Sequence, residues 1–330
     1  MTGAETARAT EHRWIRVAIP RYTLALAGVT IAGAMIVTLA TPSRQVATGI
    51  MVAAVALIGL PHGAYDGVIG RRLSRPRFGH GWWAVFGGLY LASAALGVLF
   101  WIITPWLALS TLLVLGALHW GLDDLETAPR SIWVRSWFAV SRGSIPIAVP
   151  MVAHPSEIAE IFGALTLSSI TGSAITPVGA VILGVALPGV AAQLMRAYRD
   201  DKRGAVRGAL EIAALTAWFV ATDPLLGFTL YFCMWHAARH SLRSASELDP
   251  ARFGVAMSRY LRGIIGVTLL TWVLVAAVWF VLLDTADPER TWWRVIFIGL
   301  FALTLPHVAL EWIESRVTAD EESVSSESAS

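Results

Sequence analysis

Four histidines lie near the ends of otherwise apolar segments of the chain. They are His62 in GLPHGAYD, His119 in ALHWGLDD, and His236 and His240 in CMWHAARH. An ionisable side chain inside a membrane helix marks a functional site by default. Imidazole is also the commonest protein ligand of metal ions near neutral pH. These histidines therefore predict a metal centre in hydrophobic surroundings.

The spacing of polar residues around the histidines strengthens this prediction. His236 and His240 are four residues apart, which places both rings on one face of a helix, as two ligands of one ion require. Each of the other three histidines in apolar segments is followed, at the same offset, by an acid. Such an acid either accepts the ring N–H of a ligand or of a neighbouring residue, or marks the membrane boundary. The pairs are His62 with Asp66, His119 with Asp123, and His307 with Glu311. For His307 the sequence leaves three roles open: a fifth ligand, a support for a ligand, or a cavity wall.

The composition indicates where these residues must lie. Of the 330 residues, 56% are hydrophobic and only 15% are charged, whereas soluble domains carry roughly 25% charged residues. One cysteine, Cys233, excludes an internal disulfide and a CxxC motif. The only lysine, Lys202, lies in the polar segment RAYRDDKRG, so the chain is not a retinal-binding opsin. We expect an all-α, polytopic transmembrane helix bundle.

Ten apolar stretches are long enough to cross a bilayer as helices. Arginine-rich and arginine-poor connections alternate between them, and the positive-inside rule then places both ends of the chain in the cytoplasm of a cell-membrane protein. We expect a cytoplasmic tail at 1–21, a transmembrane domain at 22–316 and a disordered acidic tail at 317–330. The predicted spans are 22–40, 47–69, 82–103, 106–122, 131–152, 173–195, 205–222, 224–242, 263–283 and 291–310.

This topology places the histidines at one depth. His62, His119, His236, His240 and His307 fall near the C-terminal ends of even-numbered spans, which run from outside to inside. All five imidazoles therefore belong to the cytoplasmic half of the bundle. Aromatic residues at that level either line a substrate cavity or pack the helices, and they are Tyr65, Trp120, Tyr231, Phe232 and Trp235.

Two arginines also fall within predicted spans. An unpaired charge at a helix centre costs roughly 2.5–3.5 kcal/mol or more, so Arg142 should face the bundle or a wet cavity. Arg239, inside the HxxxH turn, should reach the cytoplasmic surface or pair with Asp66, Asp123 or Asp124.

Imidazole donors suit Zn, Cu, Fe or Ni, and a four-histidine membrane site with open positions favours Fe(II) and O2 acting on a lipid. Three other interpretations remain open. A haem-binding electron-transfer protein also uses facing histidines, although the pair His236/His240 suits one non-haem metal better. A di-iron desaturase or hydroxylase uses more histidine boxes. In a transporter, the histidines would form a proton relay.

A family resemblance narrows these choices. GLPHGAYD, HWGLDD, WHAARH and the late LPHVALE, in this order, resemble the signature segments of the Brp/Blh family of bacterial and archaeal β-carotene dioxygenases. The resemblance implies a membrane-embedded, Fe(2+)-dependent enzyme that cleaves the central 15,15′ double bond of β-carotene with O2. The products would be two molecules of all-trans-retinal, supplied to a microbial rhodopsin. It also implies that His62, His119, His236 and His240 bind the iron, and it carries no ligand role to His307.

Overall fold

The computed structural model describes residues 14–125, 131–284 and 286–327, with side chains described up to Val317. Within these ranges the chain forms helices joined by short turns and contains no strand, which confirms the predicted all-α class. The main helices, in chain order, are α2 (Ile15–Ala40), α3 (Arg44–Ala54), η1 (Val55–Gly59), α4 (Leu60–Gly63), α5 (Asp66–Phe78), α6 (Trp82–Ile103), α7 (Pro105–Asp123), α8 (Ile132–Gly143), α9 (Ile145–Ala153), α10 (Pro155–Thr166), α11 (Gly172–Asp200), α12 (Lys202–Ala221), α13 (Pro224–Thr229), η3 (Leu230–Ala237), α14 (Ala238–Leu248), α15 (Phe253–Leu282) and α16 (Pro288–Glu327).

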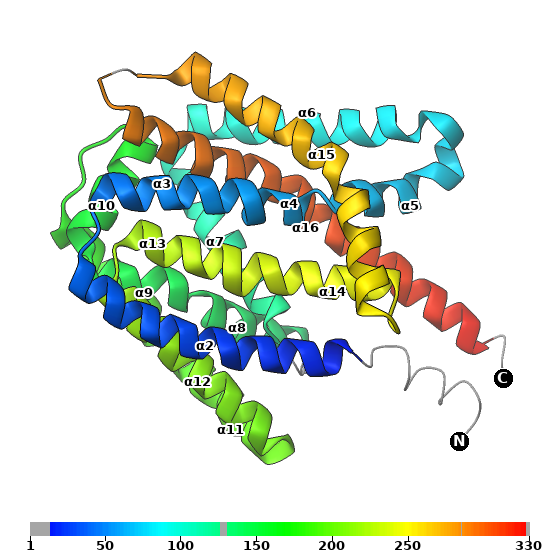
Figure 1. Ribbon diagram of the computed structural model, residues 1–330, viewed down its shortest axis with the longest axis horizontal. Coiled ribbons are helices and arrows are strands. Elements are labelled where there is room, and N and C mark those ends of the chain that lie inside the picture. The colour runs from blue at the N-terminus through cyan, green and yellow to red at the C-terminus, as the bar shows by residue number, and fades with distance from the viewer. Residues whose placement is uncertain (1–13, 126–130, 285, 328–330) are drawn as a thin grey trace.

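The long helices run side by side as one bundle (Figure 1). The beginning of α2 and the end of α16 lie at the same end of this bundle, the right-hand end in the view of Figure 1. The alternation of arginines requires this arrangement of the two helix ends. The orientation of the bundle in a membrane stays a prediction.

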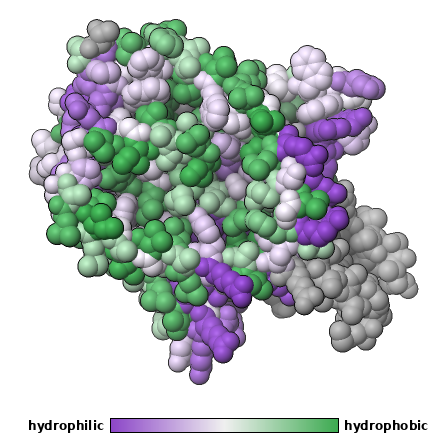
Figure 2. All heavy atoms as spheres, in the orientation of Figure 1, coloured by the Kyte–Doolittle hydropathy of each residue, from purple (hydrophilic) through white to green (hydrophobic). Residues whose placement is uncertain are grey.

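Seven helical stretches among the described residues are long and apolar enough to cross a membrane, so the chain is a multi-pass membrane protein. One of them, Arg44–Ile103, contains two predicted spans, so the seven stretches account for eight of the ten predicted spans. Their outer faces carry exposed apolar side chains, such as Ile102 at 73% and Val281 at 84% exposure. Apolar residues cover much of the visible face, while hydrophilic residues gather at its right, lower and upper left edges (Figure 2).

The two remaining predicted spans, 131–152 and 224–242, are helical but not uniform. The first is divided into α8 and α9 at Ser144, because Pro146 has no N–H to continue the hydrogen-bond ladder. The second consists of α13, the π-helical η3 and α14. Both segments carry buried charged groups, Arg142 at 9% exposure and Arg239 at 4%.

The chain segments outside the spans differ in detail from the predictions. Helix α2 begins at Ile15, earlier than the predicted 22, and residues 1–13 lie outside the described residues. Helix α16 continues to Glu327, so the segment at 317–327 is helical where we expected disorder. Extending an existing helix avoids the cost of nucleating a new one, which explains how a polar tail continues it. The division into three domains stays a prediction.

Candidate metal centre

Five histidines from five helical elements converge in the interior of the bundle. His62 comes from α4, His119 from α7, His236 from η3, His240 from α14 and His307 from α16. Four of them are 3–8% exposed, and the side chain of His240 is 12% exposed. The structure therefore brings together all five imidazoles that the sequence placed at one depth.

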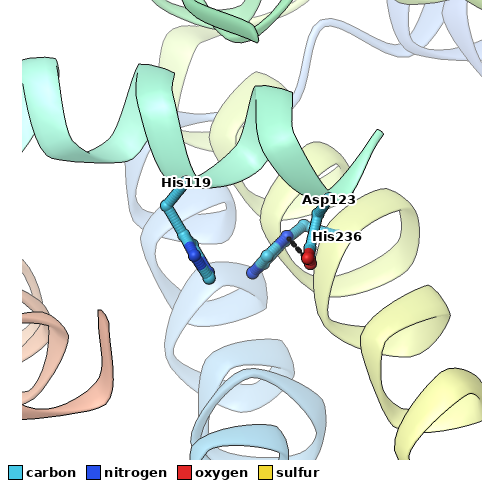
Figure 3. Close-up of side chains that lie close together, drawn as sticks. All are labelled: His119, Asp123 and His236. Atoms are coloured by element: carbon cyan, nitrogen blue, oxygen red, sulfur yellow. Dashed lines mark ion pairs between the residues drawn. The ribbon is translucent and has the colours of Figure 1, made fainter. Parts of the chain in front are cut away.

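Four of the rings form a closed cycle. Ring centres are 5.3 Å apart for His62 and His236, 4.9 Å for His236 and His119, 5.2 Å for His119 and His307, and 5.7 Å for His307 and His62. His240 lies 5.6–6.0 Å from three of these rings, those of His62, His236 and His307. The side chains of His119 and His236 point toward one another, with their rings edge to face, and Asp123 lies beside His236 (Figure 3).

Each carboxylate of the site contacts histidines from helices other than its own. Asp66 Oδ1 lies 2.8 Å from Nδ1 of His307, and its Oδ2 accepts a 2.7 Å hydrogen bond from the Tyr90 hydroxyl. Asp123 Oδ2 lies 3.3 Å from Nδ1 of His240 and 3.5 Å from Nδ1 of His236. In the described contacts both acids therefore pair with a neighbouring histidine from another helix and not with the histidine four residues earlier.

Glu311 combines both kinds of contact. Its carboxylate lies 3.2 Å from Nδ1 of His119, 3.7 Å from Nε2 of His240 and, within α16, 3.5 Å from Nε2 of His307. The remaining ring, His62, directs Nδ1 to the Gly59 carbonyl, which leaves the lone pair of its Nε2 available to bind a metal ion. All five rings are therefore oriented by a neighbouring oxygen, as metal-bound histidines almost always are.

The local backbone around the histidines departs from α-helix in two places. Segments η1 and η3 are π-helical: Leu60 N–H bonds the Val55 carbonyl and Ala238 N–H bonds that of Cys233, five residues back. Such turns occur frequently at functional sites. Gly59 permits the two segments to meet, since a Cβ there would lie 2.6 Å from the Phe232 ring. The π turns thus rotate His62 and His236 toward the common centre.

The donor set fits a buried transition-metal ion. Two overlapping groups place ligand atoms within 4.8 Å of one another, namely His119, Asp123 and His236, and His119, His307 and Glu311. Nε2 of His119 and Nε2 of His307 are buried without a hydrogen-bond partner. A buried polar atom without a partner is costly, and a metal ion would satisfy both. Imidazole with carboxylate support suits iron, zinc or copper.

Comparison with known proteins decides between the open interpretations. A sequence model of the family β-carotene 15,15′-dioxygenase matches residues 53–314, a range that contains all five histidines. The chain belongs to the β-carotene 15,15′-dioxygenase family. It is therefore an enzyme of a carotenoid-cleaving dioxygenase family, and the predicted resemblance is confirmed.

Three curated relatives are similar over most of their length. The probable β-carotene 15,15′-dioxygenase Blh of Halobacterium salinarum is 28% identical over 303 residues, covering 80% of this chain and 83% of the relative. The β-carotene 15,15′-dioxygenase of an uncultured marine bacterium is 26% identical over 267 residues, covering 78% and 90%. The probable β-carotene 15,15′-dioxygenase Brp of Halobacterium salinarum is 26% identical over 302 residues, covering 82% and 74%. No solved structure matches the chain.

Three of the five aromatic residues predicted to line a substrate cavity lie beside the histidines of this dioxygenase-family chain. The Phe232 ring lies 5.5 Å from that of His62, the Trp120 ring lies 6.3 Å from that of His236, and Tyr231 packs against Trp120 at 5.2 Å. The other two predicted lining residues pack elsewhere. Tyr65 stacks on Tyr260 of α15, and Trp235 donates a 3.3 Å hydrogen bond to Thr30 of α2.

A buried ionic network, which the sequence predicted only in part, lies beside the site. Arg239 contacts Asp124 at 2.6 Å and Glu211 at 3.0 Å, and Arg142 contacts Glu211 at 2.9 Å and Asp124 at 3.7 Å. The prediction that Arg142 faces the bundle is confirmed, as is one expected partner of Arg239. We missed Glu211 and Tyr90, although each is an isolated polar residue within an apolar span, which is the signal that could have found them.

Proposed function

We propose that this chain is an iron-dependent membrane dioxygenase that cleaves the central 15,15′ double bond of β-carotene. The observation that carries the proposal is the convergence of five imidazoles, four of them buried, in the membrane bundle of a β-carotene 15,15′-dioxygenase family member. The C=C bond is broken and each of its carbons receives one atom of O2, so that two molecules of all-trans-retinal account for every atom.

The histidines provide the ligands for Fe(2+) in this proposal. His62, His119, His236 and His240 bind the ion, as the family resemblance implies, and the neighbouring oxygens keep their rings in place. Bound iron supplies the activation of dioxygen. The protein binds and orients the substrate and excludes water from the reacting atoms.

The substrate is an apolar polyene, and it and O2 both reach the site from the bilayer. Phe232 and Trp120 lie beside the histidines, and Tyr231 packs against Trp120. These aromatic side chains are the proposed contacts of the polyene. Burial of this region removes bulk water, so the central double bond can be held against the metal in a dry site. The absence of a proton-transfer step from the net reaction means that no general base is required.

We place the protein in the cell membrane with both chain ends in the cytoplasm. Arginine-rich segments at the predicted inner side support this orientation, since such segments favour the cytoplasm. Retinal leaves the site as an apolar aldehyde and remains in the bilayer. A microbial rhodopsin in the same membrane is the proposed acceptor.

Expression in cells that make β-carotene tests the proposal. Wild-type protein should bleach the orange cells and form retinal, measured by chromatography, and the purified protein should contain iron. His62→Ala and His236→Ala should lose both properties, whereas His80→Ala, at an exposed histidine outside the cluster, should keep them. Unchanged carotenoid with folded, iron-loaded protein would refute the substrate. A Soret band from the purified protein would establish haem binding instead.

A further inference from the structure

The geometry points to His307 as a fifth imidazole ligand of the metal, held in place by Asp66 and Tyr90. This inference rests on the proposed function, because it assigns a further residue to the same iron site. The sequence leaves a fifth ligand as one of three roles for His307, and the choice among them follows from its position and its hydrogen bonds in the bundle.

The position of the His307 ring is equivalent to that of the four proposed ligands. Its centre lies 5.2 Å from His119, 5.7 Å from His62 and 5.7 Å from His240. Metal–nitrogen bonds of roughly 2.0–2.1 Å place ring centres about 4.5 Å apart for adjacent ligands and about 6.4 Å apart for opposite ligands. All three distances fall between these limits, and without His307 the cycle of rings is open between His119 and His62.

The orientation of His307 leaves one nitrogen available. Asp66 Oδ1 lies 2.8 Å from Nδ1, close enough to accept a hydrogen bond from Nδ1–H, so Nε2 is the atom whose lone pair can bind a metal. Tyr90 donates to the other oxygen of Asp66 and so orients the carboxylate. Nε2 itself is buried without a hydrogen-bond partner. A carboxylate behind one ring nitrogen and a vacant second nitrogen are the arrangement of a metal-ligating histidine.

Glu311 offers a competing role for His307. Its Oε1 lies 3.5 Å from Nε2 of His307, one helical turn away, so the histidine could instead form an ion pair with this acid. Glu311 is shared with His119, to which it is closer at 3.2 Å, and with His240. Glu311 is closer to His119 than to His307 and also contacts His240, so we assign it to the support of His119. Nε2 of His307 is then available to bind the ion.

Five imidazole ligands have a consequence for the reaction. An ion with six positions then has one left for an exogenous molecule, instead of the two that four histidines would leave. A chelating ligand that needs two positions would therefore bind poorly.

Cobalt(II) spectroscopy with ligand rescue tests the role of His307. The full-length protein is loaded with Co(II), whose visible absorption depends on the number of ligands. His307→Gly should change this spectrum and weaken Co(II) binding, and free imidazole should restore the wild-type spectrum by filling the vacated position. His154→Gly is the matched control, because His154 is a partly buried histidine whose Nε2 bonds the Phe219 carbonyl.

Two further variants separate ligation from folding. Asp66→Asn should weaken metal binding about 10–100-fold while the spectrum keeps its shape, since the ligand remains and only its support is lost. His307→Gln keeps the side-chain size and a hydrogen bond to Asp66, and it should show the same spectral change as His307→Gly. A His307→Gly protein with wild-type Co(II) spectrum and affinity, insensitive to imidazole, would overturn the assignment. If His236→Ala also leaves Co(II) binding intact, the proposed iron site itself fails.

Discussion

Helices α7 and α8 touch backbone to backbone at two glycines, and this contact makes a sharp prediction. A Cβ added at Gly121 would lie 1.8 Å from the Ala139 carbonyl oxygen, and one added at Gly143 would lie 1.9 Å from that of Ala117. Real Cβ atoms essentially never come within 3.0 Å of such an atom. Gly121→Ala must therefore separate the two helices by about 1.2 Å or more, because the atom in the way is backbone and cannot rotate aside.

The separation would act directly on the metal centre. His119 and Asp123 flank Gly121 on α7. The ring centre of His119 lies 4.9 Å from that of His236, and Asp123 Oδ2 lies 3.3 Å from Nδ1 of His240. Metal sites tolerate displacements of only about 0.5 Å, and a 1 Å misplacement can reduce a reaction rate about 100-fold. Overpacking typically costs about 1–3 kcal/mol of folding stability. We expect Gly121→Ala to lose iron, to lower retinal formation at least about 100-fold and to unfold at a lower temperature.

The matched control is Gly116→Ala on the same helix. Its Cβ would meet only the Trp120 ring of its own helix, at the ordinary contact distance of 3.4 Å. Both substitutions add one methyl group and reduce backbone freedom equally, so they differ only in the clash with α8. Iron content, retinal formation and thermal unfolding are measured for both. If Gly121→Ala matches Gly116→Ala in all three, the close approach of α7 and α8 does not hold the site together.

Three further predictions concern charges and metal. Glu211→Gln should destabilise the protein by about 3–5 kcal/mol, because it leaves Arg142 and Arg239 sharing the single carboxylate of Asp124. Thermal unfolding measures this loss, and equal unfolding temperatures for the variant and the wild type would contradict the prediction. Asp123→Asn should weaken iron binding about 10–100-fold in a metal titration, whereas Asp287→Asn, in an exposed pair with Arg290, should have no effect. Treatment with an iron chelator should abolish retinal formation and added Fe(2+) should restore it; activity that survives complete iron removal would show that another metal, or none, is used.

The parts of the fold that depend on local sequence were predictable. Helix positions follow from runs of apolar residues, and the alternation of arginines placed His62, His119, His236 and His307 at one depth, where the structure brings their rings together. Hydropathy is averaged over a window of residues, so it locates a helix without describing its backbone. The π turns of η1 and η3 are set by contacts such as Gly59 against Phe232, which lie far apart in the sequence.

Which histidine each acid contacts could not be predicted, and the reason is geometric. An acid four residues after a histidine points the same way from the helix, toward the centre of the bundle. There, histidine rings from neighbouring helices direct their Nδ1 atoms toward the acid. Asp66 therefore contacts Nδ1 of His307 on α16, and Asp123 contacts Nδ1 of His240 on α14. Each acid thereby holds a histidine that another helix supplies, and the site is held by contacts between helices. Substitution of Asp66 should therefore disturb His307 on α16 more than His62, its neighbour in sequence, whose Nδ1 is held by the Gly59 carbonyl.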